Sequence, residues 1–215
     1  MRSILIQQIY PDTPGVKLLE LTREWHQRYC DTWFIDYKSV IENPCPSIPP
    51  EAGSWGKVEL IRQALKKYDH VYWLDADALI VDIDTHLRDA VTPYKIGACW
   101  HRIPQGAHWN IGCLYVDNTD ATRHFFNKWL ASYPPKVNGH NWMEQGVFND
   151  MARQGREVVT ISDRWNATYD VNMVPDAVVL GFHGQGDVEY RYKLMKQALD
   201  KIANKKATTQ AMSEV

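Results

Sequence analysis

The feature that most restricts the fold of this chain is a continuous apolar run, Val71–Leu74, that ends at two aspartates, Asp75 and Asp77. Four apolar residues without polar alternation are typical of a strand that is covered on both faces, as in a parallel sheet. A second apolar run, Ala78–Ile80, follows directly. Open α/β sheets bind their ligands at the carboxyl ends of the strands. The segment therefore predicts a layered α/β domain with a ligand site at the end of this strand.

Strand and helix patterns alternate along the chain, which favours a parallel sheet flanked by helices. Thr13 and Ser54 are expected to cap the first two helices, with Pro14 at the first position of the first helix. We predict strands at residues 3–9, 32–37, 71–74, 95–100, 111–117, 157–161 and 177–182, a proline-rich loop at 43–54, and helices after Thr13, after Ser54 and at 119–131, 142–153 and 188–204. The pattern predicts one domain over residues 1–204, with 205–215 as a polar tail or a truncated linker.

The composition argues against several classes of protein. The chain has 215 residues, a net charge of −2 and a pI near 6.4, so it lacks the basic surface that general nucleic-acid binding requires. We expect neither a membrane span nor a signal peptide, because every apolar stretch is short or interrupted by charges. The four cysteines include no Cys-x-x-Cys pair, so free thiols are expected and a zinc site is not. Together these features favour a cytoplasmic protein.

The two aspartates have the chemistry of a metal site. Carboxylate oxygens suit Mg²⁺ or Mn²⁺, which usually fill their remaining coordination positions with water and substrate phosphates. A metal held in this way neutralises a leaving nucleoside diphosphate as its bond to a sugar breaks. The alternative is a solvated acidic turn, since Asp-x-Asp is common by chance. The flanking apolar runs favour the metal site, because they place Asp75 and Asp77 at a strand end.

The segment around the aspartates resembles GT-A glycosyltransferases. The resemblance is greatest to the group of fungal mannan galactosyl- and mannosyltransferases and plant xyloglucan xylosyltransferases. The matching segments follow in the expected order and are Trp55–Leu60, Tyr68–Ile80, Asn110–Val116, Glu144–Phe148, Arg164–Asn166 and His183–Gly184. The chain also resembles a glycosyltransferase domain from chlorella viruses, which would place it in a host cytoplasm. The resemblance implies a GT-A fold, a single Rossmann-like domain with a central, mostly parallel sheet flanked by helices.

The resemblance also implies a metal site. Asp77 would bind the ion directly, while Asp75 would bind it or reach it and the ribose through water. His183, at the end of an apolar run, would be the third ligand, and Gly184 beside it would let the backbone approach a diphosphate closely. The alternative for His183 is a packed or surface histidine without a ligand.

The nucleotide would be held between the ends of the first two strands and the turn that contains Asp75 and Asp77. By resemblance, Lys57 would lie near the donor, although a surface cation on an amphipathic helix is an equal alternative. The family holds the base and the ribose at the ends of the first two strands. The residues of this sequence at those places, which would contact the nucleotide, are Gln7, Tyr10 and Tyr37.

The donor sugar would be contacted by Glu144 and Gln145, which correspond to an acidic-Gln pair in the family. Glu144 would orient the sugar hydroxyls, and Gln145 would support the positive charge of the sugar in the transition state. The family more often has aspartate in place of Glu144, and a helix-end acid that favours the helix dipole is the alternative. Asn110 would be a further contact to the acceptor or to the donor sugar.

These inferences predict a metal-dependent glycosyltransferase. It would use Mn²⁺ or Mg²⁺ and transfer a hexose or deoxyhexose from a nucleoside-diphosphate sugar, expected to be UDP-linked, to a hydroxyl of a glycan or glycoprotein acceptor. Retention of the anomeric configuration is implied by the resemblance alone. Two alternatives remain open: a haloacid-dehalogenase-type phosphatase, whose motif usually has threonine where this chain has Ala78, and a non-catalytic sugar- or nucleotide-binding module.

Overall fold

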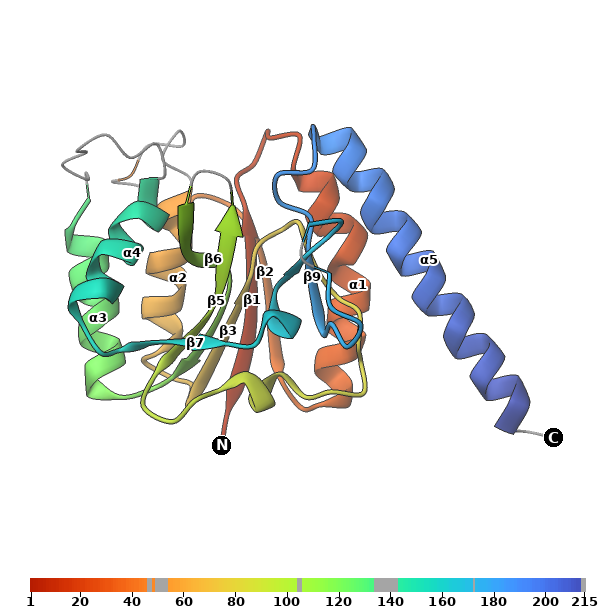
Figure 1. Ribbon diagram of the computed structural model, residues 1–215. Helices are drawn as coiled ribbons and strands as arrows, with labels where there is room; N and C mark the ends of the chain where they lie inside the picture. Colours follow the sequence, from red (N-terminus) through yellow and green to blue (C-terminus); the bar gives the residue numbers. More distant parts are fainter. Residues whose placement is uncertain (46–47, 49–53, 104–105, 134–142, 172, 214–215) are drawn as a thin grey trace.

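The computed structural model is a mixed α/β domain built on a six-stranded sheet with the strand order β2-β1-β3-β6-β5-β7 (Figure 1). The strands of this sheet are β1 Ser3–Ile9, β2 Asp36–Ile41, β3 His70–Leu74, β5 Ile96–Ile103, β6 Gly106–Asp117 and β7 Val158–Ile161. A second, three-stranded sheet has the order β4-β9-β8, with β4 Ala78–Ile80, β8 Ala167–Thr168 and β9 Val179–Gly181. The structure describes all residues except 46–47, 49–53, 104–105, 134–142, 172 and 214–215.

The large sheet is mostly parallel. Strand β1 pairs in parallel with β2 and β3, and β5 pairs in parallel with β7. Strand β6 runs antiparallel to both of its neighbours, β3 and β5. The expected α/β fold with a central, mostly parallel sheet flanked by helices is therefore confirmed.

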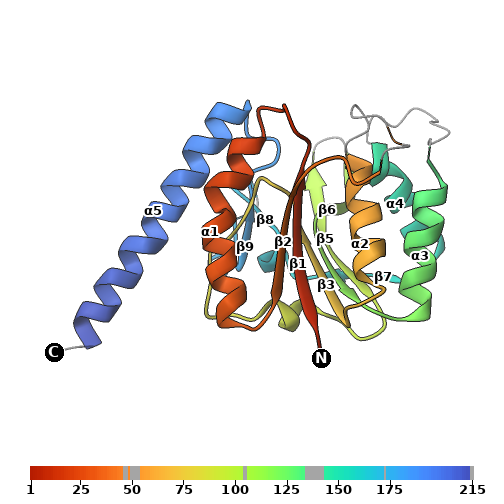
Figure 2. The same ribbon diagram turned by 180° about the vertical axis from the view of Figure 1, so that it is seen from behind.

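Helices cover both faces of the large sheet (Figures 1 and 2). The helices are α1 Val16–Thr32, α2 Gly56–Ala64, α3 Asp120–Ala131, α4 Met143–Gln154 and α5 Val188–Ser213. Helices α2, α3 and α4 pack on one face, and α1 and the small sheet lie on the other. Helix α5 packs along α1. Among the described residues, no helix is long and apolar enough to cross a membrane.

The predicted double-faced strand is confirmed in β3. Its five residues are all buried. Val71 and Trp73 belong to the core beneath α2 and α3, whereas Tyr72 and Leu74 belong to the core on the α1 face. Because each face of the strand contributes large apolar side chains to a separate core, β3 is fixed from both sides, and so is the turn that follows it.

Several predicted boundaries were wrong. Helix α1 begins at Val16 without a side-chain cap, because the Thr13 hydroxyl donates to the Tyr10 carbonyl instead. Helix α2 also begins without a side-chain cap, one residue after Trp55. The predicted strand at 32–37 starts late, at Asp36, because α1 continues to Thr32.

Other elements were absent from the sequence prediction. The short strands β4 and β8 were missed, and β6 starts at Gly106, five residues before the predicted strand. Helix α5 continues to Ser213, beyond residue 204, where a polar tail was expected. Most of the predicted loop at 43–54 and the start of the helix predicted at 142–153 lie outside the described residues. All four cysteines are free, as expected.

Candidate active site

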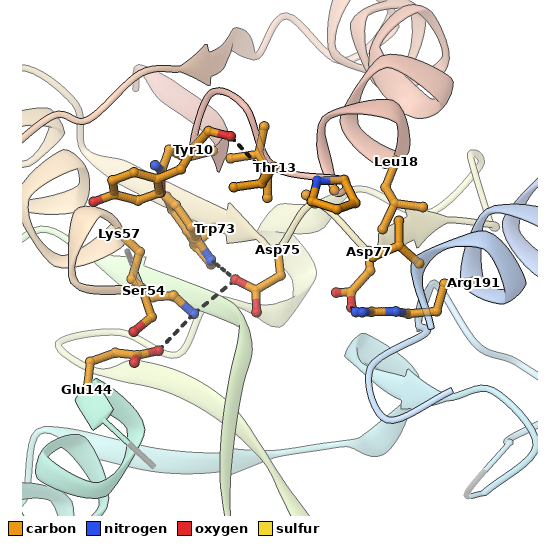
Figure 3. Close-up of a pocket in the computed structure, with 16 residues that line it drawn as sticks. Tyr10, Thr13, Leu18, Ser54, Lys57, Trp73, Asp75, Asp77, Glu144 and Arg191 are labelled. Atoms are coloured by element: carbon orange, nitrogen blue, oxygen red, sulfur yellow. Dashed lines mark hydrogen bonds and ion pairs between the residues drawn. The ribbon is translucent and has the colours of Figure 1, made fainter. Parts of the chain in front are cut away.

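Two cavities open at the carboxyl end of β3 and meet at three side chains, Lys57, Asp75 and Glu144. The first, of about 560 Å³, extends over β1 and the start of α1 towards α5 (Figure 3). The second, of about 380 Å³, extends over β6, the start of α4 and the loop after β9. A ligand with two differing parts could therefore occupy both cavities while its junction lies against the three shared residues.

The two aspartates lie in a turn that joins the two sheets. The backbone N–H of Asp75 donates to the carbonyl of Gly112 on β6, at 2.7 Å. The carbonyl of Asp75 accepts from Ala78, the first residue of β4. The carbonyl of Asp77 accepts from Phe182, at 2.9 Å, just after β9. The main chain thus fixes Asp75 to the large sheet and Asp77 to the small one, which confirms the predicted strand-end position.

Asp75 is held by two donors. Its Oδ1 accepts from the indole nitrogen of Trp73 at 2.7 Å and lies 2.9 Å from Nζ of Lys57. A Cβ atom on Gly112 would lie only 3.3 Å from Oδ2 of Asp75, so a glycine there keeps this second oxygen accessible. The Asp75 side chain is 37% exposed and faces the cavity (Figure 3).

Lys57 is a buried cation between two carboxylates, not the surface cation that was the alternative. Its side chain is 5% exposed, and Nζ also donates to the Ile111 carbonyl and lies 3.7 Å from Oε1 of Glu144. Burial alone would lower the pKa of Lys57, but the charges of Asp75 and Glu144 raise it above its ordinary value. Lys57 therefore stays protonated and supplies positive charge where the two cavities meet.

Asp77 is more deeply buried than Asp75, with 13% of its side chain exposed. Its Oδ2 forms an ion pair of 2.8 Å with Nη1 of Arg191 on α5 (Figure 3). Burial raises the pKa of Asp77, the charge of Asp75 raises it further, and His183 and Arg191 oppose the shift. The position therefore disfavours an unaccompanied negative charge and favours a cation next to Asp77.

His183 is brought to the aspartates by the pairing of β4 with β9. Its Nε2 lies 3.2 Å from the amide nitrogen of Asn110 and 3.0 Å from the hydroxyl of Thr168. Burial lowers the pKa of His183, and the charges of Asp77 and Asp75 oppose the shift. A neutral imidazole can accept these hydrogen bonds at Nε2, and it is also the form that binds metals.

The second cavity is lined by polar groups from several elements. Asn110, Gln145, His183 and Gly184 all line it, which brings together residues predicted to contact the sugar and the metal. The side-chain oxygen of Gln145 accepts from the N–H of Ile111, at 3.3 Å. Glu144 lies in the first turn of α4, as the helix-end alternative also expects, and its side chain is buried and faces Lys57.

Of the three residues predicted to contact the nucleotide, Tyr10 lines one of the two cavities, whereas Gln7 and Tyr37 line neither. Tyr10 lines the first cavity, together with its neighbour Gln8. Gln7 is fully buried: it donates to the Asp75 carbonyl at 3.2 Å and accepts from Tyr37 at 2.8 Å. In this structure Gln7 and Tyr37 therefore brace the backbone of Asp75, and neither of them is among the residues that line the cavity.

The predicted metal ligands are of the types that bind a divalent cation, but in this structure their side chains are not arranged around a common point. Within the described residues, no three side chains of His, Cys, Asp or Glu converge closely enough to hold a metal ion. Lys57 and Arg191 lie against the two carboxylates instead. The donor set itself, two carboxylates and a neutral imidazole that influence one another electrostatically, matches what Mn²⁺ or Mg²⁺ accepts.

Three residues around the site were missed by sequence reasoning. Arg191 was placed only on a helix, and its contact with Asp77 spans 114 positions of sequence. Thr168 lies on β8, a strand too short to show a pattern. His101 stacks on His183 with ring centroids 5.5 Å apart. The pairing of His101 with His108 across the β5–β6 hairpin would have been a usable signal, had the start of β6 been predicted correctly.

Comparison with known proteins supports a glycosyltransferase. Residues 22–99, less than half of the chain, match the family model of the galactosyl transferase GMA12/MNN10 family. This segment includes Lys57, Asp75 and Asp77. No curated protein matches the chain by sequence.

Solved structures of low sequence identity share the fold. A glycosyltransferase involved in the glycosylation of the major capsid of PBCV-1 is 15% identical with a TM-score of 0.73, over 92% of this chain and 100% of that one. Mouse xyloside xylosyltransferase 1 is 12% identical with a TM-score of 0.53, over 87% of this chain and 99% of that one. A Drosophila β-1,4-galactosyltransferase 7 mutant, solved with manganese, UDP-Gal and xylobiose, is 11% identical with a TM-score of 0.50, over 86% and 72%. These likenesses confirm the GT-A fold.

Proposed function

We propose that the chain is a metal-dependent glycosyltransferase that transfers a hexose or deoxyhexose from a UDP-linked donor to a hydroxyl group of a glycan acceptor. The observation that carries this proposal is the position of the two aspartates after the central strand, where Asp75 lines both cavities and Asp77 lines the first. The first cavity would take the nucleotide and the second the donor sugar and the acceptor. The scissile bond would then lie next to Lys57, Asp75 and Glu144.

The reaction needs positive charge at the diphosphate. The bond between the anomeric carbon and the diphosphate oxygen breaks, and its electron pair leaves with the nucleoside diphosphate. The acceptor oxygen bonds to the anomeric carbon, and its proton passes to an oxygen of the leaving diphosphate. A divalent ion bound by Asp75, Asp77 and His183 would supply the charge that stabilises this leaving group. Lys57 would add a fixed ammonium at the junction of the cavities, because its raised pKa keeps it charged.

The sugar end of the site would combine the charged groups of Arg102, Lys57, Asp75 and Glu144 with several neutral hydrogen-bonding groups. Burial, with a smaller contribution from the neighbouring His183, lowers the pKa of His101 to about 4, so the imidazole of His101 is neutral near pH 7. Burial lowers the pKa of His108 as well. Together with Asn110 and Gln145, these side chains suit the hydroxyl groups of an uncharged sugar.

Retention of configuration remains part of the proposal through the resemblance. The carboxylates among the described residues that line the second cavity are Asp75 and Glu144, and both lie beside Lys57. The Lys57 ammonium lies 2.9 Å from the Asp75 carboxylate and 3.7 Å from the Glu144 carboxylate, so neither group stands alone beside an acceptor hydroxyl. This arrangement does not favour the free general base that an inverting reaction would use.

The test is an assay of the purified protein with Mn²⁺ and a panel of nucleotide sugars. The proposal predicts slow release of nucleoside diphosphate, greatest with a UDP-linked donor and lost when a chelator is added. Release of inorganic phosphate from a phosphomonoester would support the phosphatase alternative. Binding of a sugar or nucleotide with no product from any donor would support the binding module.

A further inference from the structure

The guanidinium of Arg191 lies against the carboxylate of Asp77, and both residues line the first cavity (Figure 3). The Nη1–Oδ2 distance is 2.8 Å. Only 13% of the Asp77 side chain is exposed, so its carboxylate has little contact with water and depends on a cation close by. Arg191 supplies that cation here.

The guanidinium is attached to the site by few bonds. Its hydrogen bond to Asp77 uses Nη1, while its Nε is buried and has no hydrogen-bond partner among the described residues. A quarter of the side chain is exposed. By comparison, the ammonium of Lys57 is almost fully buried and contacts Asp75, Glu144 and the Ile111 carbonyl. Arg191 is therefore the more easily displaced of the two cations.

The helix that carries Arg191, α5, is joined to β9 by a short link that contains His183. This link, residues 182–187, also contains Gly184 and Gly186, both with positive φ, 74° and 57°. A Cβ atom on Gly184 would meet nothing within 4 Å, so the link is open to the second cavity on that side. Positive φ is accessible to glycine at little cost, which allows this link to adopt other conformations.

We propose that Arg191 is an internal counter-ion that competes with the metal. In the metal-free protein it neutralises Asp77, and a divalent cation that binds Asp77 must displace it, because two cations on one carboxylate repel each other. The proposal rests on the proposed function, since it takes Asp75 and Asp77 as the metal ligands. It goes further by assigning a role to a residue of α5, outside the predicted ligand set.

The competition has a measurable consequence. A protein whose binding-competent state is a minor population binds its ligand more weakly by that fraction. If the Arg191–Asp77 pair is formed in about nine molecules of ten, removal of the guanidinium raises the affinity for Mn²⁺ about tenfold. The buried carboxylate also loses its cation, so the metal-free variant should melt at a lower temperature and recover stability when Mn²⁺ is added.

The experiment is titration of Mn²⁺, without nucleotide, into the intact protein and into Arg191→Gln, followed by calorimetry and by thermal melting. We expect Arg191→Gln to bind Mn²⁺ about tenfold more tightly and to show the larger Mn²⁺-dependent rise in melting temperature. Arg191→Lys retains a cation and should stay close to the unmodified protein. The matched control is Glu189→Gln, which removes an ion pair between α5 and Lys17 of α1 and should leave Mn²⁺ affinity unchanged.

Equal or weaker Mn²⁺ binding by Arg191→Gln would overturn the proposal. If turnover of the unmodified protein still requires Mn²⁺ in that case, only the role of Arg191 is lost. Absence of Mn²⁺ binding in both proteins, together with turnover that a chelator does not reduce, would overturn the proposed function as well. A tenfold gain that also appears in Glu189→Gln would show a general effect of loosening α5, and would likewise contradict a specific role for Arg191.

Discussion

Asp75 and Asp77 are two residues apart but belong to differently built regions. Asp75 directly follows β3 of the large sheet, and its cation, Lys57, is buried on α2. Asp77 precedes a strand of the small sheet, and its cation, Arg191, comes from α5 near the end of the chain. The large-sheet carboxylate is the more exposed of the two, with 37% of its side chain accessible against 13%.

The difference shows that one short motif can hold one aspartate, Asp75, in a fixed position and leave the position of the other, Asp77, dependent on elements that can move. The surroundings of Asp75 are braced by Gln7, Trp73 and Gly112, all from strands of the large sheet or next to them. The surroundings of Asp77 depend on the pairing of β4 with β9 and on the position of α5. We therefore expect changes at Asp75 to affect stability and catalysis together, and changes at Asp77 to affect mainly metal binding and catalysis.

The largest expected effect is loss of turnover when either carboxylate is removed. Asp77→Ala should lower Mn²⁺-dependent turnover by about a thousandfold or more, because the charge of the leaving diphosphate loses its support. Asp75→Ala should be nearly as severe and should also lower the melting temperature, since Lys57 is then buried with one carboxylate fewer. Release of nucleoside diphosphate measures turnover. Full activity in Asp77→Ala would contradict the whole account.

Removal of Lys57 should have the next largest effect, on stability. Breaking a buried ion pair on one side costs about 3–5 kcal/mol, and we expect the lower end for Lys57→Ala because Asp75 is partly exposed. Urea unfolding measures the free energy of unfolding. The exposed pair Arg153–Asp150 is the control, and Arg153→Ala should change stability little. Similar losses in the free energy of unfolding of both variants would mean that the ion pairs of Lys57 stabilise the protein no more than an exposed pair does.

Mutation of Gln145 should affect the rate and spare nucleotide binding. Gln145 lines the second cavity and not the first. Gln145→Ala should lose about 10- to 1000-fold in turnover, the range for removal of a preorganised polar contact. Calorimetry with UDP and Mn²⁺ should show unchanged affinity. Normal turnover with a slightly lower melting temperature would reduce Gln145 to a scaffold residue, and Asn110 would be the next candidate.

The smallest expected effect is a pH dependence of stability from His26, which connects both regions. Its Nδ1 lies 2.7 Å from Oε1 of Gln7, and its Nε2 accepts from the N–H of Ile80 on β4. Burial lowers the pKa of His26 to about 3 in the folded protein, against 6.5 when unfolded. The unfolded chain therefore binds a proton below about pH 6.5 while the folded one does not, and stability falls as the pH falls from 6.5 towards 3.

The slope due to His26 is about 1.4 kcal/mol per pH unit at most. It is measured by urea unfolding at several pH values between 4 and 7 (about three pH units). His26→Gln should remove this part of the slope, at some cost in stability at neutral pH because both hydrogen bonds are changed. An unchanged slope in His26→Gln would show that other groups dominate the acid sensitivity.

The sequence allowed correct predictions for elements whose pattern is contained in a few neighbouring residues. The apolar run of β3 and the aspartates after it could be placed correctly, because burial on both faces leaves a visible pattern. The site of Asp77 was harder to predict, since it depends on β4 and β9, strands of three residues whose pairing links distant positions. Arg191 shows the same limit, because an arginine on an amphipathic helix resembles any solvated cation until the helix is placed.

The placement of Gln7 illustrates a different limit. Its position near the end of β1 correctly suggested closeness to the site. Alternation along a strand determines which face a side chain is on, but both faces of β1 are buried, so the pattern could not distinguish a cavity-lining residue from a bracing one. Gln8 lines the first cavity, while Gln7 donates a hydrogen bond to the backbone carbonyl of Asp75.

The central claim is that Asp75 and Asp77 form a site for a metal-bound nucleoside diphosphate. Calorimetric titration of UDP in the presence of Mn²⁺ tests it most directly, repeated with chelator and with Asp77→Asn, which keeps the shape of the side chain and removes its charge. The account predicts that UDP binds in Mn²⁺, more tightly than GDP does, and that both the chelator and the substitution weaken binding sharply. UDP affinity that neither the chelator nor Asp77→Asn changes would contradict it.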